Sequence, residues 1–268
     1  MKIGKNTIPR TAICTSDENT IVVRGQDLCH DAIGHLNFAD YFFLLLTGKH
    51  PSAAASAVLN ATLVAITEHG FVPSVQAARM TFAAAPDALQ GAVAAGILGC
   101  GSVILGASET AGHLFLDVEQ RMNAGASLDD AATAALQSLK AQGRPIPGYG
   151  HPLHKAMDPR VSRLIDVATQ AGADLRYVQI AQALERAVAG VVGKDLRMNV
   201  SAAIPAVLLG VGFPVVSLRG VPILARTAGL IAHLAEEAQM PSGFALSYQA
   251  TRELQYEGEV PAGFGKAR

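Results

Sequence analysis

The sequence predicts an all-α protein, because several segments carry helix boundary signals while few carry strand signals. Residues 52–70 open directly after a proline and end on glycine. Residues 127–143 begin at Ser127, a candidate N-cap, with acidic residues in the first turn and a lysine in the last. That order of charges complements the helix dipole. Only two short β-branched runs occur, at 19–25 and 213–218, so strands should be a minor part of the fold.

A third helical segment, 158–172, has a well-defined start. Asp158 is the expected N-cap, and Pro159 takes the first helical position, where its missing N–H costs nothing. Apolar residues then recur at the helical spacing, and Gly172 ends the pattern. Just before this segment lies a turn rich in glycine and proline, 141–150. We take that turn as a domain boundary and as a natural place for a ligand site.

Composition limits the classes of function. The chain has 268 residues, which is enough for one large domain or two smaller ones. Half of the residues are hydrophobic and 16% are charged, against about 25% in an average soluble domain. A large core and an apolar subunit interface are therefore expected. The net charge of -1 predicts neither a nucleic-acid partner nor an anionic membrane surface.

Two uncharged stretches, 88–108 and 199–218, are long enough to span a bilayer. Glycines interrupt the first and prolines the second, so we expect buried helices of a soluble protein. No apolar segment typical of a signal peptide follows the N-terminus. Cys14, Cys29 and Cys100 lack metal-site spacing, which predicts buried thiols, a cytoplasmic location and no metal.

The most informative motif is a histidine inside a glycine turn. His151 follows two glycines, so the backbone can bend sharply, and an imidazole there can act as a general acid near neutral pH. Arg160 lies in the first turn of the following helix, where its side chain and the nearby N–H groups can receive a carboxylate. The pair indicates a site for a small acid with a carbonyl or hydroxyl group. A loop histidine and a surface arginine remain the alternative.

The full run G-Y-G-H-P-L-H-K-A-M-D-P-R, residues 148–160, resembles the signature of the citrate synthase superfamily. Four other segments resemble the family in the same order along the chain: IVVRGQDL, FADYFFLLLTGKHPS, EHGFVPSVQAAR and ARTAGLIAHLAE. The chain is shorter than a typical citrate synthase. Its length is closer to that of the citryl-CoA lyases, including the lyase module of ATP-citrate lyase.

The resemblance implies a citrate synthase-like fold with two helical domains and the active-site cleft between them. The large domain is expected at residues 1–150 and 226–268, and the small domain at 151–225. The resemblance also implies a homodimer that takes an acyl-CoA and a 2-oxo acid such as oxaloacetate, with coenzyme A entering as part of the substrate. No metal is implied.

Individual roles follow from matched positions. His151 matches the histidine that hydrogen-bonds the substrate keto or hydroxyl oxygen, and Arg160 and Arg226 match carboxylate-binding arginines. His69 matches a histidine that contacts the oxaloacetate part, although it could instead interact with a helix C-terminus. The residues expected along coenzyme A are Pro147, Gly148, Tyr149, Gly150 and Lys155.

Other polar residues have simpler expectations. Arg226 is surrounded by apolar residues, so its burial calls for a partner. That partner is either a bound carboxylate or a carboxylate of the protein such as Glu109. His113 and His233 lie on apolar helical stretches and are expected to be packing or capping residues.

Three positions depart from the family pattern. Ile104 stands where the synthases have the histidine that stabilises the enolate. The lyase module of ATP-citrate lyase also lacks that histidine. Ser201 stands at the aspartate of the family's N-V-D segment, and an unperturbed serine is a poor general base. Leu246 stands where an arginine normally reaches the partner's site, with Arg252 six residues later. These changes favour a substrate with one carboxylate and a neutral tail, such as a citramalyl-like thioester.

The predicted function is a citryl-CoA lyase-type cleavage of a 3-hydroxyacyl-CoA to acetyl-CoA and a 2-oxo acid. In it, His151 and Ser201 are the catalytic candidates. The alternatives are a non-catalytic protein of the same fold that binds a CoA thioester or carboxylate, and a citrate synthase-like condensing enzyme.

Overall fold

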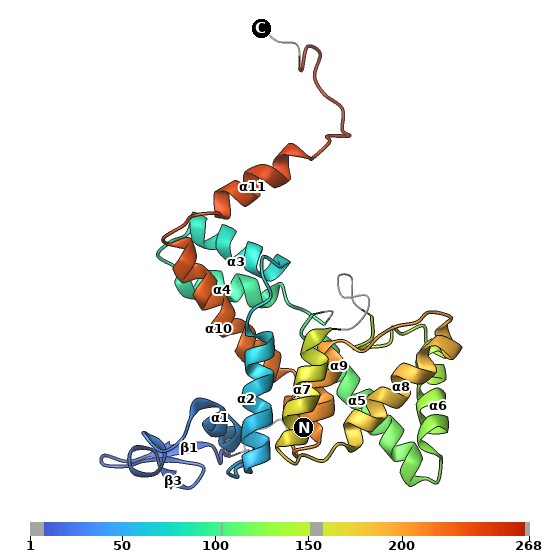
Figure 1. Ribbon diagram of the computed structural model, residues 1–268. Helices are drawn as coiled ribbons and strands as arrows, with labels where there is room; N and C mark the ends of the chain where they lie inside the picture. Colours follow the sequence, from blue (N-terminus) through green and yellow to red (C-terminus); the bar gives the residue numbers. More distant parts are fainter. Residues whose placement is uncertain (1–7, 103, 151–157, 266–268) are drawn as a thin grey trace. The chain divides into compact units, whose positions relative to one another are not determined.

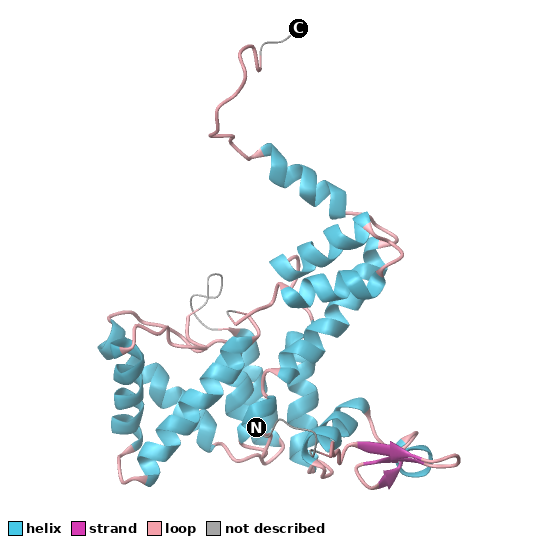
Figure 2. Cartoon of the chain, turned by 180° about the vertical axis from the view of Figure 1, so that it is seen from behind, coloured by secondary structure: helices cyan, strands magenta, loops and turns pink. Residues whose placement is uncertain are grey.

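The computed structural model describes residues 8–102, 104–150 and 158–265, and helices dominate it (Figures 1 and 2). The helical segments are α1 (Phe38–Thr47), α2 (Ala53–Thr67), α3 (Pro73–Ala84), α4 (Leu89–Leu98), α5 (Gly106–Asn123), α6 (Leu128–Ala141), α7 (Pro159–Gln170), α8 (Arg176–Val192), α9 (Val200–Leu209), α10 (Gly220–Glu237) and α11 (Gly243–Arg252), with a π-helical turn η1 (Leu28–Ala32) and a 3₁₀ turn η2 (Val215–Ser217). The strands β1 (Cys14–Ser16), β2 (Ile21–Val23) and β3 (Gln26–Asp27) form one small antiparallel sheet. The predicted helical fold is confirmed.

The chain divides into two compact units. The first unit contains Met1–Glu68 and Gly101–Arg226, and the second contains His69–Cys100 and Thr227–Arg268. The division in α10 lies next to the boundary expected at 225 and 226. The other boundaries of the two units lie near residues 68 and 100. The boundary expected at residues 150 and 151, and with it the division into a large and a small domain, remains a prediction.

The core of the first unit surrounds α9. This helix packs against α2, α5, α7 and α8, and α8 also packs against α6. Residues 202–208 of α9 are all buried, as expected for a helix that is apolar on every face. The position of this helix matters for the site, because Ser201 lies in its first turn.

The helix starts anticipated from the sequence are confirmed. Ser127 Oγ accepts a hydrogen bond from Asp130 N (3.2 Å), and Asp158 Oδ1 accepts one from Arg160 N (3.1 Å). Pro159 is the first residue of α7. Of the two β-branched runs, 19–25 contains β2, whereas 213–218 forms the 3₁₀ turn η2 behind Pro214.

The expectation that all three cysteines are buried needs correction. Cys14 and Cys29 are exposed and only Cys100 is buried, because Cys14 lies on the exposed strand β1 and Cys29 in the turn η1. Neither uncharged stretch is one continuous helix. Among the described residues, Val215–Glu237 is long and apolar enough to cross a membrane by length and composition alone, with 39% of its apolar window buried. It also carries the buried Arg226.

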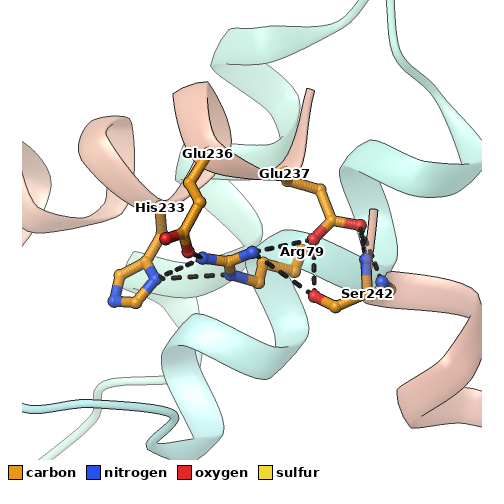
Figure 3. Close-up of polar contacts among 6 residues, drawn as sticks. Arg79, His233, Glu236, Glu237 and Ser242 are labelled. Atoms are coloured by element: carbon orange, nitrogen blue, oxygen red, sulfur yellow. Dashed lines mark hydrogen bonds and ion pairs between the residues drawn. The ribbon is translucent and has the colours of Figure 1, made fainter. Parts of the chain in front are cut away.

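The second unit is held together by a buried ion-pair network, shown in Figure 3, in addition to a small apolar core of α3, α4 and α10 residues. Arg79 on α3 is 1% exposed and donates to Glu237 Oε2 (2.9 Å), to Ser242 Oγ (3.3 Å) and to Glu236. Its Nη2 lies 2.8 Å from His233 Nδ1. Because arginine only donates hydrogen bonds, that ring nitrogen acts as the acceptor. His233 therefore takes part in the polar network of the second unit.

Glu237 links this network to the start of α11. Its carboxylate accepts hydrogen bonds from Ser242 N (2.7 Å), Ser242 Oγ (2.6 Å) and Gly243 N (2.6 Å). Burial alone would raise the pKa of Glu237, but these donors and Arg79 together lower it below the usual value. The carboxylate is thus held ionised, which matches the charge of the arginine that it faces.

Candidate active site

The glycine turn at 147–150 lies directly against the first turn of α9. Gly148 has φ +83°, a conformation that favours glycine. A Cβ added to Gly148 would lie 2.5 Å from Ala202 Cβ and 2.8 Å from Ala202 N. Only a residue without a side chain fits at this position, so the sequence requirement for glycine follows from the close approach of the two backbones.

Backbone hydrogen bonds join the same turn to the chain that leads into α9. Asn199 N donates to Gly148 O (2.9 Å), and Gly150 N donates to Arg197 O (2.7 Å). Tyr149 and Met198 form an antiparallel bridge between them. The Asn199 side chain also donates to Gly150 O (2.6 Å). The turn is therefore fixed in position relative to Ser201.

The side chain of Tyr149 is turned into the core rather than toward a ligand. It is 7% exposed, and its hydroxyl donates to Ala181 O in α8 (2.8 Å). Burial, and secondarily the nearby Glu185 carboxylate, raise the pKa of Tyr149 well above its usual value. Glu185 also accepts a hydrogen bond from Met198 N (3.0 Å). Any contact of this turn with a coenzyme would consequently come from Pro147 and from the backbone.

Asp158 connects the starts of α7 and α9. Its Oδ1 accepts from Arg160 N and Nε (3.1 and 2.9 Å), and its Oδ2 accepts from Arg160 Nη2 and Val200 N (2.7 and 3.2 Å). The carboxylate is 1% exposed. Burial acts to raise its pKa, yet the hydrogen bonds and charge of Arg160, with the Val200 N–H, lower the pKa below the usual value. Arg160, which was expected at a carboxylate site, is thus already paired on one edge.

Ser201 is the second residue of α9 and is partly buried. Its N–H donates to the N-cap side chain, Asn199 Oδ1 (2.9 Å). Among the residues that the structure describes, no carboxylate is hydrogen-bonded to the Ser201 hydroxyl. The serine therefore has no activating acid or base in the described part of the site, as its sequence neighbours suggested.

A polar cavity of about 260 Å³ lies beside the turn. Its lining comes from α5, α6 and the segment that follows α6, and it includes His113, Asp117, Arg121, Arg144 and Pro147. Arg121 pairs with Asp117 at 3.1 Å. His113 is exposed in the middle of α5, so it is neither the packed nor the capping residue that was expected.

The remaining predicted site residues are placed one by one. Arg226 is buried in α10, and Glu109, considered above as its partner, pairs with Arg219 at 2.7 Å. His69 begins the second unit and is partly buried. His151 and Lys155 lie outside the described residues. Within the described part, the structure brings together the 147–150 turn, the Asp158–Arg160 pair and Ser201.

In the described ranges, no group of three or more histidine, cysteine, aspartate or glutamate side chains is arranged to hold a metal ion. The expectation of metal-independent chemistry stays a prediction.

Comparison with known proteins gives the family. A model described as "Citrate synthase, C-terminal domain" matches residues 10–243. The chain belongs to the citrate synthase family. It is 29% identical to a citrate synthase of Synechocystis sp. over 208 residues, which cover 75% of this chain and 50% of that protein. The chain spans about half the length of the curated relatives that it matches.

Solved structures match over more of the chain. Citryl-CoA lyase from Hydrogenobacter thermophilus superposes with a TM-score of 0.82 and 32% identity, covering 95% of this chain and 96% of that one. ATP citrate lyase from Methanothrix soehngenii, solved in complex with citrate and coenzyme A, has a TM-score of 0.77 and 21% identity, covering 96% of this chain and 43% of that one. The second likeness shows the fold alone. The family and these neighbours are enzymes.

Proposed function

We propose that the chain is a carbon–carbon lyase of the citryl-CoA lyase type. It would cleave a 3-hydroxy-3-carboxyacyl-CoA to acetyl-CoA and a 2-oxo acid such as oxaloacetate. The observation that carries this proposal is the likeness to a citryl-CoA lyase over nearly the whole of both chains. The likeness to citrate synthases extends over about half of their length.

The reaction breaks the bond between the hydroxyl-bearing carbon and the α-carbon of the thioester. The electron pair of that bond moves to the α-carbon and forms the enolate of acetyl-CoA. The hydroxyl group gives its proton to the group that hydrogen-bonds it and becomes the keto group of the 2-oxo acid. One proton must then reach the enolate carbon, so the site needs a group that orients the oxygen and a source of one proton.

The residues of this chain divide these tasks. His151 polarises the substrate oxygen, while Arg160 and Arg226 hold the carboxylate and His69 contacts the 2-oxo acid part. Pro147 and the backbone of the glycine turn lie along coenzyme A, and the adjoining polar cavity provides room for part of that large molecule. Lys155 meets the coenzyme as a basic group.

Ser201 bears on the rate of the reaction. Condensation requires a base that removes a proton from the weakly acidic methyl group of acetyl-CoA, and a serine without an activating partner does this poorly. Cleavage only requires that a proton be delivered to an enolate. A hydroxyl group or ordered water can do so at a reduced rate, since general acid–base catalysis contributes about 10²–10⁴-fold. The serine therefore slows both directions, because cleavage and condensation share this transition state, and the lyase direction is supported by the likeness to a citryl-CoA lyase.

The same serine supports a second candidate, a non-catalytic protein that binds a CoA thioester or carboxylate. Loss of the family aspartate explains such a role directly. It explains less well why His151, Arg160 and Arg226 are all retained. We place the lyase first for that reason and because of the likeness to a citryl-CoA lyase over nearly the whole of both chains.

The leucine at position 246 favours a substrate with a neutral tail. It is partly buried on α11, where the family arginine is absent. Arg252 does not take its place. Six residues along an α-helix place a side chain about 120° away around the helix axis, so Arg252 lies on a different face from Leu246. The Arg252 guanidinium instead lies 5.7 Å from the ring of Tyr248. A 3-hydroxyacyl-CoA with a methyl group in place of the second carboxylate arm, as in a citramalyl thioester, is the substrate class we favour.

The chain would act as a homodimer in the cytoplasm, with neither nucleic acid nor membrane as a partner. These features follow from the family resemblance and from the nearly neutral composition.

One assay separates the candidates. Purified protein is incubated with citryl-CoA or with a citramalyl-type analogue, and the release of acetyl-CoA and of the 2-oxo acid is followed by chromatography. Faster cleavage of the analogue supports both the lyase and the neutral tail. Clear preference for citryl-CoA rejects the neutral tail alone. Calorimetric binding without any product rejects the lyase and supports the binding protein.

A further inference from the structure

Three Asp-x-Arg pairs occur in the first unit, and one of them differs from the other two. Asp158–Arg160, Asp174–Arg176 and Asp195–Arg197 each join residues two positions apart by an ion pair. The aspartate side chain is 53% exposed in the second pair and 64% in the third, but 1% in the first. Exposed pairs of this kind contribute little to stability, whereas a buried one constrains the geometry of both partners.

The buried aspartate is fully engaged on both oxygens. One oxygen receives the backbone and Nε–H groups of Arg160, and the other receives the Arg160 Nη2–H and the Val200 N–H that begins α9. Two parallel hydrogen bonds, from Nε and Nη2, therefore hold one edge of the guanidinium. This bidentate arrangement fixes the plane of the guanidinium as well as its position. The other edge of Arg160 includes Nη1, and the side chain keeps 21% of its exposure.

We propose that Asp158 is a positioning residue that fixes the Arg160 guanidinium, relative to the start of α9, in the orientation that receives the substrate carboxylate. This inference rests on the proposed function, in which Arg160 binds that carboxylate. A long arginine side chain normally loses rotamer freedom when it binds a ligand. Here the loss occurs during folding, so the ligand meets an arginine that is already oriented.

The same contacts argue against a direct chemical role for Asp158. Its pKa is lowered by the hydrogen bonds and charge of Arg160 despite the opposing effect of burial, so it stays ionised near neutral pH. Both oxygens are also occupied by donors of the protein. Asp158 therefore does not supply the proton that the family aspartate would have supplied at position 201. It acts only through Arg160.

The test compares Asp158→Asn with Asp174→Asn. Asparagine caps a helix about as well as aspartate, and the Asp174 side chain is 53% exposed, so both variants should fold, which circular dichroism checks. Asp158→Asn removes the charge and one acceptor that faces Arg160, and we expect KM for the cleaved thioester to rise at least tenfold while kcat changes less than threefold. Asp174→Asn removes the same charge from the same motif, and KM should stay within twofold.

A double variant shows whether Asp158 acts through Arg160. If it does, Asp158→Asn added to Arg160→Ala raises KM no further than Arg160→Ala alone, because the two residues act as a unit. Multiplying effects would overturn the inference. The ¹⁵Nε–¹Hε signal of Arg160, which needs no substrate, should indicate an ordered side chain in the wild type and a mobile one in Asp158→Asn. An equally ordered signal in both proteins would also overturn it.

The outcomes distinguish this inference from the function on which it rests. If Arg160→Ala raises KM but Asp158→Asn does not, the positioning role is wrong and the proposed function stands. If Arg160→Ala leaves KM unchanged, the carboxylate role of Arg160 in the proposed function is wrong. If the protein cleaves neither thioester, the lyase is rejected, and calorimetric affinity for oxaloacetate in the same variants decides the positioning role.

Discussion

Replacing Gly148 by alanine should destabilise the first unit strongly, because two separate costs combine at this position. With φ +83° the backbone is in the left-handed region, which costs a residue with a Cβ roughly 1–2 kcal/mol. The new methyl group would also lie 2.5 Å from Ala202 Cβ and 2.8 Å from Ala202 N. Ordinary carbon–carbon contact is about 3.5–4.0 Å, so the turn and α9 must separate by about 1 Å.

The contact with α9 adds the second cost. Overpacking of this kind costs about 1–3 kcal/mol, and a buried helix backbone cannot rotate away as a flexible side chain would. Together the two costs amount to about 2–5 kcal/mol, which corresponds to a decrease in Tm of about 5–15 °C for a protein of this size. Activity should fall as well, because the displaced turn carries the hydrogen bonds that set the start of α9.

Gly143 is the matched control, since it lies in the same connection between α6 and α7. It also has a positive φ, +64°, but an added Cβ would have nothing within 4 Å. Gly143→Ala should therefore show only the backbone cost of roughly 1–2 kcal/mol. Both variants are compared with the wild type by thermal unfolding followed by circular dichroism. If Gly148→Ala is no less stable than Gly143→Ala, the close approach of the turn to α9 is refuted.

Three further predictions concern charged groups. Arg79→Met should lower the free energy of unfolding by about 3–5 kcal/mol, because it leaves the buried Glu237 carboxylate without its arginine; urea denaturation measures this. Asp158 has a lowered pKa in the folded state, so the stability lost in Asp158→Asn should be largest near neutral pH. That difference should shrink as the pH falls below about 5 and through the lowered pKa. Ser201→Asp should increase the rate of thioester cleavage, by up to about 10²-fold.

Each of these has a comparison that can contradict it. Arg186→Met removes an arginine that is 60% exposed and paired with Asp129, and its effect should stay within about 0.5 kcal/mol. A similar loss in Arg79→Met would contradict the role of burial. For Asp158→Asn, a stability difference that is constant between pH 3 and 7 would mean that the charge is irrelevant. For Ser201→Asp, a rate equal to that of Ser201→Ala would count against a missing proton donor.

The helices that begin at clear local signals were predictable from the sequence. Ser127 and Asp158 cap their helices through hydrogen bonds to residues two or three positions away, and such contacts depend on the local chain alone. The glycine turn was predictable for the same reason. The likeness of its motif to a family signature then gave the fold as a whole, which propensity alone would not have done.

Contacts between distant segments were not predictable in this way. The Arg79 network joins α3 to residues 154 to 163 positions further along the chain, and no local pattern reveals such a partner. Arg160 was expected to face a ligand, and its pairing with Asp158 became evident only with the geometry. Tyr149 was expected along coenzyme A, yet its side chain enters the core, where its hydroxyl donates to a carbonyl oxygen of α8.

The start of α9 explains why an aspartate at position 201 would differ from an ordinary surface carboxylate. Its first N–H groups are already satisfied, since Val200 N donates to Asp158 and Ser201 N donates to Asn199. A carboxyl group introduced by Ser201→Asp would thus lie near the helix N-terminus, which favours its charge, and near the ionised Asp158, which disfavours it. The second influence raises its pKa and so makes it a better proton donor to an enolate. If so, combining Ser201→Asp with Asp158→Asn should shift the alkaline limb of the pH–rate profile, where the proton donor ionises, to lower pH, and an unchanged limb would mean that the two positions are electrostatically independent.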